Sequence, residues 1–215
     1  MICGVDEAGR GPVIGPMVVA GVLVEKDDFL KKIDVRDSKM LSPGKRKTLS
    51  KKIKENTTYT IRVILAEEID NLRDEMSLNE IEAGIFASII DELCDEVTTV
   101  YVDAASTDEE DFARMINERL DKDLDIISRH AADESFPVVS AASILAKVKR
   151  DEEIERISED LDQEIGSGYP SDIRTRDFLK RWVKEHGSLP PYTRRSWYTA
   201  KNVLEKSKTK RLDEF

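Results

Sequence analysis

Two adjacent carboxylates near the start of the 215-residue chain precede an arginine that lies between two glycines. The segment runs Asp6-Glu7-Ala8-Gly9-Arg10-Gly11 and follows an apolar stretch. Hard divalent cations prefer carboxylate oxygens, and glycine lets a backbone approach a phosphate or a sugar closely. These residue types suit a metal-dependent phosphodiester site, although a solvated acidic turn would have the same composition.

The elements that must position these residues follow from the spacing of apolar side chains. Five runs rich in β-branched residues predict strands at 2–5, 17–24, 59–65, 98–102 and 124–128. The pattern is helical at 78–93, 108–121 and 138–161, and a basic helix at 172–186 precedes a final stretch at 196–207. This order predicts an α/β fold, with a mixed five-stranded sheet flanked by helices.

Capping patterns mark the starts of two of these helices. Ser77 and Glu80 form a capping box before the helix at 78–93. The next helix has two candidate boxes, since either Ser106 with Glu109 or Thr107 with Glu110 fits the pattern.

Three acids fall at or shortly after predicted strand ends: Asp6, Asp103 and Asp133. Because neighbouring strands lie about 4.8 Å apart, we expect these acids to converge at one edge of the sheet. Glu7 requires the strand to end or bend, since successive strand residues point to opposite faces, and Gly9 permits a bend. A helix cap for Asp103 and a turn for Asp133 are the alternative roles.

Charge is distributed unevenly along the chain, whose formal net charge is -10. Residues 26–54 carry a local +7 and residues 172–211 a local +8. Such a chain can bind a polyanion on one face, because salt confines electrostatic attraction to about 10 Å, but solvated lysine-rich helices would show the same pattern. The change in composition near residue 165 predicts a catalytic domain at 1–165 and a basic helical segment at 166–215, packed on or beside it.

Cysteine content and hydropathy favour a reduced, cytoplasmic protein. Cys3 and Cys94 are too few and too far apart for a zinc knuckle or a disulfide framework. No basic leader precedes an apolar stretch, and no window approaches 18 apolar residues. With two histidines in all, a serine triad is not expected.

Blocks of sequence spanning residues 2 to about 197 resemble type 2 ribonuclease H, in its compact archaeal form. They are Asp6 to Pro12, Asp37-Ser38-Lys39-x-Leu41, Tyr101-Val102-Asp103, Ala132-Asp133, Val139 to Ile144 with Ala146-Lys147-Val148, and Gly166-x-Gly168-Tyr169-Pro170-Ser171-Asp172. The resemblance implies a ribonuclease H-like sheet with a C-terminal helical appendage. It also implies an endonuclease that hydrolyses the RNA strand of RNA/DNA hybrids and cuts beside ribonucleotides embedded in duplex DNA, leaving 3′-hydroxyl and 5′-phosphate ends.

The resemblance further implies the catalytic and metal-binding set: Asp6, Glu7, Asp103 and Asp133. They would hold two Mg²⁺ or Mn²⁺ ions, which at a spacing of about 3.5 to 4 Å activate water and stabilise the leaving oxygen. Without cations, four crowded acids repel one another.

Two positions near Asp133 affect the choice of the ligand and of the phosphate contacts. Glu134 is the competing acid, and the family pattern places the ligand at the residue after Ala132. Ala131 departs from the family, which commonly has lysine there, so one phosphate contact is unassigned unless His130 or Arg129 supplies it.

Substrate recognition is implied at the glycine-bracketed arginine and at Tyr169. Backbone groups of Gly9, Arg10 and Gly11 would read the ribose 2′-hydroxyl at an RNA-to-DNA junction, with the arginine near phosphate. Tyr169 would stack on the following deoxyribose, where a 2′-hydroxyl would clash. A tight turn and a packing tyrosine are the structural alternatives.

Phosphate contacts are expected near a helix N-terminus, whose N–H groups suit anions. The candidates are Lys39, Ser140, Ser143 and Lys147. Lys147 would equally suit a solvated helix face. Arg194 and Arg195 could grip a nucleic-acid backbone or lie on the surface.

Two other classes of function compete with a nuclease. A non-catalytic hybrid-binding protein would gain nothing from four acids beside a polyanion. A metal-dependent phosphatase of small molecules leaves the two basic segments unexplained. A monomer without membrane contact is expected.

The C-terminal residues resemble a docking motif. Thr209-x-x-Leu212-x-x-Phe215 resembles a truncated form of the motif that docks replication enzymes on the sliding clamp. It has Thr where Gln is usual and a single terminal aromatic residue. A frayed, solvated end is the alternative.

Overall fold

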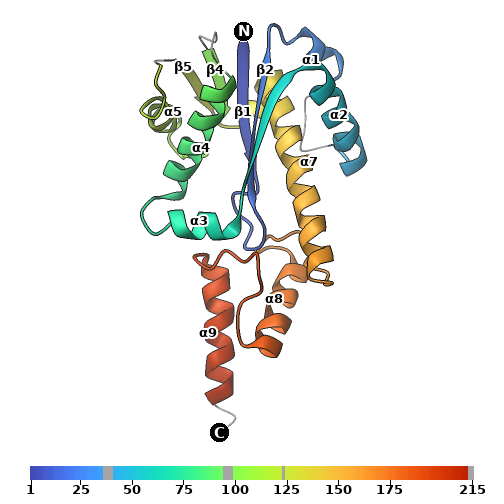
Figure 1. Ribbon diagram of the computed structural model, residues 1–215, viewed down its shortest axis with the longest axis vertical. Coiled ribbons are helices and arrows are strands. Elements are labelled where there is room, and N and C mark those ends of the chain that lie inside the picture. Colours follow the sequence, from blue (N-terminus) through green and yellow to red (C-terminus); the bar gives the residue numbers. More distant parts are fainter. Residues whose placement is uncertain (36–40, 94–98, 123, 213–215) are drawn as a thin grey trace. The chain divides into compact units, whose positions relative to one another are not determined.

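The computed structural model describes residues 1–35, 41–93, 99–122 and 124–212, the last five of these by their backbone only. The described chain forms two compact units. The first contains Met1–Ala8, Val18–Val63 and Met76–Lys149, and the second contains Gly9–Met17, Ile64–Glu75 and the chain from Arg150 onwards. Figure 1 shows the elements of both units.

The sheet confirms the predicted fold class. Its strand order is β3-β2-β1-β4-β5. β1 is antiparallel to β2 and parallel to β4, which is parallel to β5, so the sheet is mixed. The strands are β1 Ile2–Ala8, β2 Met17–Val24, β3 Thr58–Ile64, β4 Thr99–Asp103 and β5 Asp125–Arg129.

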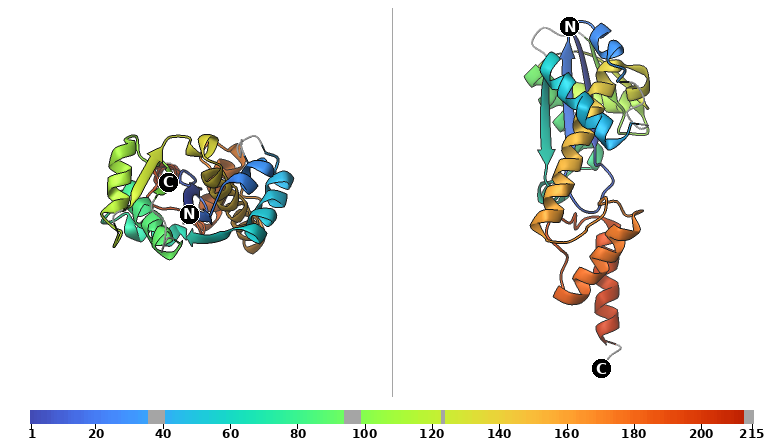
Figure 2. Two further views of the ribbon diagram at one scale, coloured as in Figure 1. Left: turned by 90° about the horizontal axis from the view of Figure 1, so that it is seen from above. Right: turned by 90° about the vertical axis from the view of Figure 1, so that its right-hand side faces the viewer.

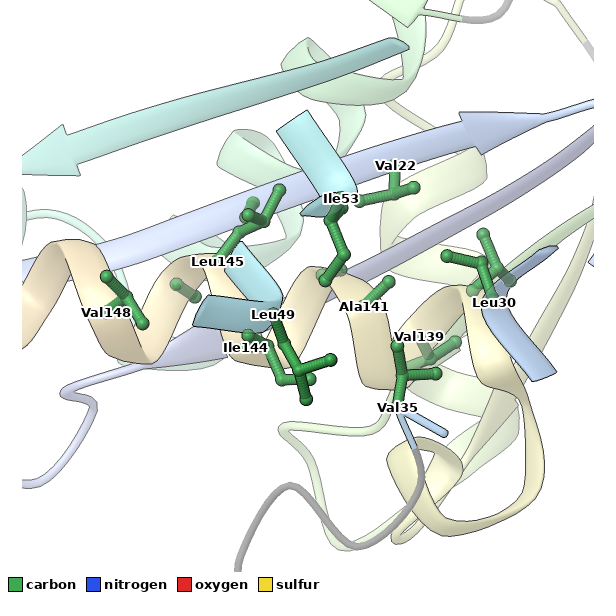
Figure 3. Packing of buried hydrophobic residues seen from close by; sticks show 14 of the residues in the cluster. Val22, Leu30, Val35, Leu49, Ile53, Val139, Ala141, Ile144, Leu145 and Val148 are labelled. Carbon is green, nitrogen blue, oxygen red and sulfur yellow. The ribbon is translucent and has the colours of Figure 1, made fainter. Parts of the chain in front are cut away.

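One face of the sheet is covered by α1 (Asp28–Lys32), α2 (Pro43–Asn56) and the first part of α7 (Pro137–Asp160). Buried aliphatic side chains from these helices and from β2 form one cluster (Figure 3). Each valine, leucine or isoleucine among them contributes roughly 1.5 to 3 kcal/mol when fully buried. A Cβ atom at Gly4 would lie 2.6 Å from the backbone carbon of Val138, so glycine allows α7 to lie against β1.

The opposite face of the sheet is covered by α4 (Leu78–Leu93) and α5 (Glu109–Asn117) (Figures 1 and 2). Gly21 points to this face, because its neighbours in β2 belong to the cluster on the other side. A Cβ atom there would lie 2.4 Å from Ile89 Cγ2 of α4. Phe86 of α4 and Phe112 of α5 meet edge to face, with ring centroids 5.4 Å apart.

The predicted capping box of α4 is confirmed. The backbone N–H of Ser77 donates to Glu80 Oε2 at 2.7 Å, and that of Glu80 donates to Ser77 Oγ at 3.2 Å. Both boxes predicted for α5 are wrong. The N-cap is Asp108, whose Oδ1 accepts from the N–H of Asp111 at 3.0 Å, because an aspartate immediately before the helix satisfies the same donors.

The second unit contains α3 (Ala66–Leu72), the end of α7, α8 (Ile173–His186) and α9 (Tyr198–Leu212). In this unit α8 and α9 lie side by side (Figures 1 and 2), which confirms the C-terminal helical appendage. Its core is a separate cluster of Val13, Ile14, Ile157, Ile165, Phe178, Leu179 and Ala200. α9 extends beyond the predicted stretch, and α3 was not predicted.

Among the described residues, no helix combines the length and the apolar character needed to cross a membrane. Cys3 is buried in β1. Cys94 and Lys39 lie outside the described residues.

Candidate active site

The first unit brings three predicted acids to the same region of the sheet. β1 and β4 are parallel, with Val5 opposite Val102, so Asp6 and Asp103 follow at the same end of neighbouring strands. Asp133 lies in α6 (Ala132–Ser135), the short helix after β5. The backbone N–H of Ala132 donates to Asp103 Oδ1 at 2.6 Å, which ties this helix to the end of β4.

Asp6 lies in a field of negative charge. Its side chain is 4% exposed. Burial raises the pKa of Asp6 well above its usual value, and the charges of Glu7 and Asp103 raise it further, against smaller opposing effects of Ser143 and Lys147. The acids therefore interact electrostatically despite their separation in sequence.

Glu7 lies within a continuous strand, so the predicted break at this residue is wrong. Glu7 pairs with Val19 and Ala8 with Val18, and the chain turns only at Gly9, where φ is +86°. The N–H of Glu7 donates to Asp6 Oδ1 at 2.7 Å. Neighbouring carboxylates on one strand thus affect each other without a bend.

Lys147 is close to the acids rather than free on a helix surface. Its Nζ lies 3.7 Å from Asp133 Oδ2 and donates to Ser143 Oγ at 2.7 Å. Asp133 is 3% exposed, whereas the competing Glu134 is exposed. Lys147 therefore places a cation beside Asp133, and Ser143, one turn earlier on α7, accepts a hydrogen bond from that cation.

Carboxylate oxygens are the ligands that a hard divalent cation prefers. In the described part of the chain, no three or more His, Cys, Asp or Glu side chains are arranged to enclose a metal ion. Mg²⁺ is usually held by one or two carboxylates, with waters and substrate phosphates completing its coordination. The mutual repulsion at Asp6 is the kind that a bound cation would relieve.

Ser140 has a structural contact. It is fully buried, and its hydroxyl donates to the backbone carbonyl of Val35. This bond anchors the first turns of α7 to the segment after α1. Ser143 is also fully buried, but its hydroxyl faces Lys147.

The second unit brings the glycine-bracketed arginine together with Tyr169. A Cβ atom on Gly11 would lie 3.7 Å from Tyr169 Cε1, so the tyrosine ring packs beside this glycine. A Cβ atom on Gly9 would lie 2.7 Å from the carbonyl oxygen of Pro16, which explains the need for glycine there. The two predicted recognition elements are therefore neighbours.

Arg150 packs against Tyr169, a contact that the sequence did not predict. Its side chain is 8% exposed, and its guanidinium carbon lies 4.9 Å from the centre of the tyrosine ring, a cation–π arrangement. It also donates to the carbonyl of Ser167. An arginine among charged residues on α7 gives no sequence signal of burial.

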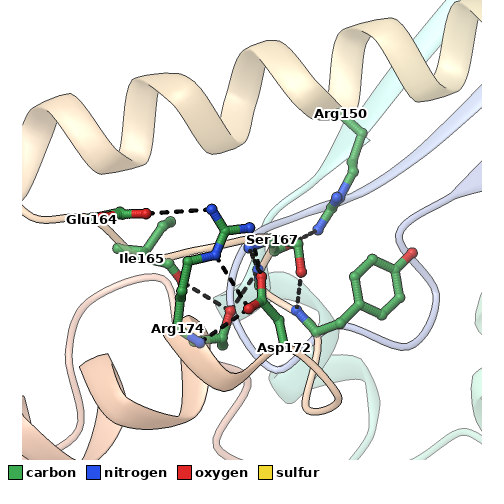
Figure 4. A network of polar contacts seen from close by, with 9 residues as sticks. Arg150, Glu164, Ile165, Ser167, Asp172 and Arg174 are labelled. Atoms are coloured by element: carbon green, nitrogen blue, oxygen red, sulfur yellow. Dashed lines mark hydrogen bonds and ion pairs between the residues drawn. The ribbon is translucent and has the colours of Figure 1, made fainter. Parts of the chain in front are cut away.

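A polar network shapes the turn that carries Tyr169 (Figure 4). Asp172 Oδ2 accepts from the N–H of Ser167 at 2.8 Å, and its Oδ1 accepts from the N–H of Arg174 at 3.0 Å, capping α8. Thr175 donates to the carbonyl of Ile165 at 2.8 Å. These bonds fix the turn on the start of α8.

Arg194 and Arg195, which were predicted to share a role, lie in different environments. Arg194 is fully buried and donates to backbone carbonyls of the loop after β1, whereas Arg195 is exposed. Adjacent arginines thus have different environments that composition does not distinguish.

Comparison with known proteins places the chain in a family. The family model described as Ribonuclease HII matches residues 3–200. The chain is 46% identical over 215 residues to ribonuclease HII of Thermococcus kodakarensis, covering 99% of this chain and 93% of that protein. The crystal structure of ribonuclease H2 from Pyrococcus horikoshii OT3 is similar with a TM-score of 0.89 and 40% identity, covering 96% of this chain and 98% of that one. A structure of the PCNA:RNase HII complex from Archaeoglobus fulgidus gives a TM-score of 0.87 and 40% identity, covering 94% and 96%. The chain therefore belongs to the ribonuclease HII family and is a ribonuclease H.

Proposed function

We propose that the chain is a metal-dependent endonuclease that hydrolyses the RNA strand of RNA/DNA hybrids and cuts beside ribonucleotides embedded in duplex DNA. The observation that carries this proposal is the placement of buried Asp6 and of Asp103 at the same end of neighbouring parallel strands, where Asp103 also binds the start of the short helix that carries Asp133. Family membership supports the same reaction class.

Four carboxylates would hold the cations: Asp6, Glu7, Asp103 and Asp133. Two Mg²⁺ or Mn²⁺ ions bound there would supply an activated water and charge stabilisation at the leaving oxygen. In the hydrolysis, a bond forms between the water oxygen and phosphorus while the bond from phosphorus to O3′ breaks. O3′ takes up a proton, so the products carry 3′-hydroxyl and 5′-phosphate ends.

Lys147 and Ser143 form the polar side of this proposed site. The Lys147 ammonium, 3.7 Å from Asp133 Oδ2, offsets part of the negative charge that a phosphate would otherwise meet. Ser143 accepts a hydrogen bond from that ammonium and so orients it. Lys39 and Ser140 remain predicted phosphate contacts, although the hydroxyl of Ser140 is engaged with Val35.

Gly9, Arg10, Gly11 and Tyr169 would recognise the junction. The glycines leave room for a ribose next to the backbone, and the tyrosine offers an aromatic face for the adjoining sugar. Their packing in one unit supports a shared role.

A sliding clamp is the proposed protein partner, through Leu212 and Phe215. The related Archaeoglobus fulgidus protein has been solved in complex with PCNA. Phe215 lies outside the described residues, and Leu212 is the last residue of α9.

Turnover on four substrates with Mg²⁺ tests the proposed activity: an RNA/DNA hybrid, a DNA duplex with one ribonucleotide, an all-DNA duplex and a simple phosphomonoester. We expect cleavage of the first two alone. Hydrolysis of the phosphomonoester would instead indicate a phosphatase, and binding of the hybrid without cleavage would indicate a non-catalytic binder.

A further inference from the structure

A buried guanidinium holds the loop that carries the glycine-bracketed arginine. Arg194 is fully buried in the second unit. Its Nε donates to the carbonyl of Gly15 at 3.0 Å, Nη1 to that of Arg10 at 2.8 Å and Nη2 to that of Gly9 at 2.6 Å. Every nitrogen of the guanidinium therefore bonds the same loop.

The backbone around Arg194 is itself fixed. Its N–H donates to the carbonyl of Val13 at 2.9 Å. Asp70 of α3 accepts from the N–H of Arg195 at 2.6 Å and from that of Ser196 at 3.0 Å. The backbone at Arg194 is therefore held in place by hydrogen bonds, and the guanidinium at the other end of the side chain is held by its bonds to the loop.

These bonds determine which way the amides of the loop point. In a planar trans peptide, the C=O and the N–H point in opposite directions, and the described chain contains no cis peptide bond. Because the carbonyls of Gly9 and Arg10 face Arg194, the N–H groups of Arg10 and Gly11 face away from it. In contrast, the N–H groups of Val13 and Ile14 both donate to the carbonyl of Gly168, at 2.8 and 3.2 Å.

We propose that Arg194 is a positioning residue that presents the N–H groups of Arg10 and Gly11 as paired donors to oxygens of the ribonucleotide. The inference rests on the proposed function of this loop. Hydrogen bonds from a cation to the carbonyls also polarise the two peptide groups, which makes their N–H groups stronger donors. A lysine ammonium is a point charge on a flexible stem and does not reproduce the planar fork.

Hydrogen exchange in the wild-type protein tests the orientation without any substitution. In the free protein, we expect the amides of Arg10 and Gly11 to exchange at least about tenfold faster than those of Val13 and Ile14. Adding a duplex with one ribonucleotide, in the presence of a metal chelator, should slow the exchange of the Arg10 and Gly11 amides. Equal protection of all four amides in the free protein would mean that the first pair points inward, and would overturn the inference.

Binding by Arg194→Lys tests the role in recognition. The measured quantity is the affinity for a duplex with one ribonucleotide relative to an all-DNA duplex, in chelator. We expect this preference to fall by about tenfold or more, with unchanged affinity for all-DNA duplex. Arg114→Lys is the control, because Arg114 is an exposed arginine that also forms ion pairs, with Asp111 and Glu118.

An unchanged preference in a folded Arg194→Lys protein would overturn the inference. If the Val13 and Ile14 amides stay protected from exchange in the variant, the loop is folded there. If the loop of the variant is unfolded, the hydrogen exchange of the wild-type protein is the test of the inference. A wild-type protein that binds both duplexes equally would instead contradict the proposed junction recognition. The two failures are therefore distinguishable.

Discussion

Asp6, a proposed cation ligand, is buried and lies near other acids. Its folded environment disfavours the negative charge, through desolvation first and then through Glu7 and Asp103. A divalent cation reverses this balance, because its charge outweighs that of each neighbouring acid.

Asp103→Asn and Asp6→Asn should each lower cleavage by roughly two orders of magnitude or more, since each removes a ligand charge but little volume. In chelator, Asp6→Asn should melt at or above the wild-type temperature, because the neutral amide removes repulsion. Cleavage rates at saturating Mg²⁺ and melting curves check both results. Near wild-type turnover, or a large loss of stability, would contradict the assignment.

Tyr169→Ala should impair cutting at a lone ribonucleotide more than cutting within a continuous hybrid. Stacking of a base on an aromatic side chain contributes about 1 to 3 kcal/mol, and a contact of similar size with the sugar would change the ratio of the two kcat/KM values roughly tenfold to a hundredfold. Tyr59→Ala is the control, because it removes the same ring from β3 in the first unit. Equal losses of kcat/KM on both substrates would mean that Tyr169 only packs against its neighbours and does not recognise the junction.

The acids were predictable as residues, but their surroundings were not. Carboxylates at predicted strand ends, with the family resemblance, make Asp6, Asp103 and Asp133 the candidates. The position of Lys147 beside Asp133 and the burial of Arg150 and Arg194 depend on tertiary packing, which charge patterns along the chain do not report.

At the scale of elements, α8 begins at a carboxylate that also fixes the Tyr169 turn. Bonds from the Ser167 N–H and from Arg174 hold the pKa of Asp172 well below its usual range. A depressed pKa means that this carboxylate stabilises the fold above its unfolded pKa of about 3.9. The contribution is lost as pH falls toward the folded pKa.

Asp172→Asn should lower the melting temperature at pH 7 by a few degrees, because the amide NH₂ cannot accept from Ser167. The difference from wild type should shrink as pH falls below about 4. Asp177→Asn, on the same helix and paired with Lys180 at 3.6 Å, is the matched control. Melting curves from pH 3 to 7 measure the difference in melting temperature between variant and wild type. A difference that does not change with pH would contradict the stabilising role of the Asp172 carboxylate.

Longer elements were easier to predict than short ones. Periodicity identified α4 and α8, which are 16 and 14 residues long. α6, with four residues, begins after Ala131 in a left-handed conformation and has no amphipathic pattern to reveal it. β1 runs on through Glu7 because its pairing with β2 continues.

At the scale of the molecule, each compact unit contains three segments of chain. The segment Gly9–Met17 belongs with residues from 150 onwards, although it directly follows β1. Changes in composition along the chain cannot reveal that the segments of two units alternate in sequence. The domain boundary at residue 165 therefore stays a prediction. The basic stretch at 172–211 falls in the second unit, and that at 26–54 in the first.

A peptide of residues 204–215 should bind the cognate sliding clamp more tightly than the same peptide with Leu212→Ala and Phe215→Ala. The two apolar side chains would fill a hydrophobic groove. Titration of the clamp with each peptide measures the difference in affinity. Identical signals would mean that the tail does not bind the clamp. Deleting residues 209–215 should leave cleavage of short duplexes by the isolated enzyme nearly unchanged.

Mapping the ends produced from a DNA duplex with one embedded ribonucleotide is the most direct test of the proposed activity. With Mg²⁺ or Mn²⁺, we expect one cut beside the ribonucleotide, leaving 3′-hydroxyl and 5′-phosphate ends, and no cut in chelator. Cleavage in chelator, or no cleavage with either ion, would contradict the four-carboxylate site. A 2′,3′-cyclic phosphate would contradict hydrolysis by water, because it forms when the ribose 2′-oxygen attacks the phosphorus.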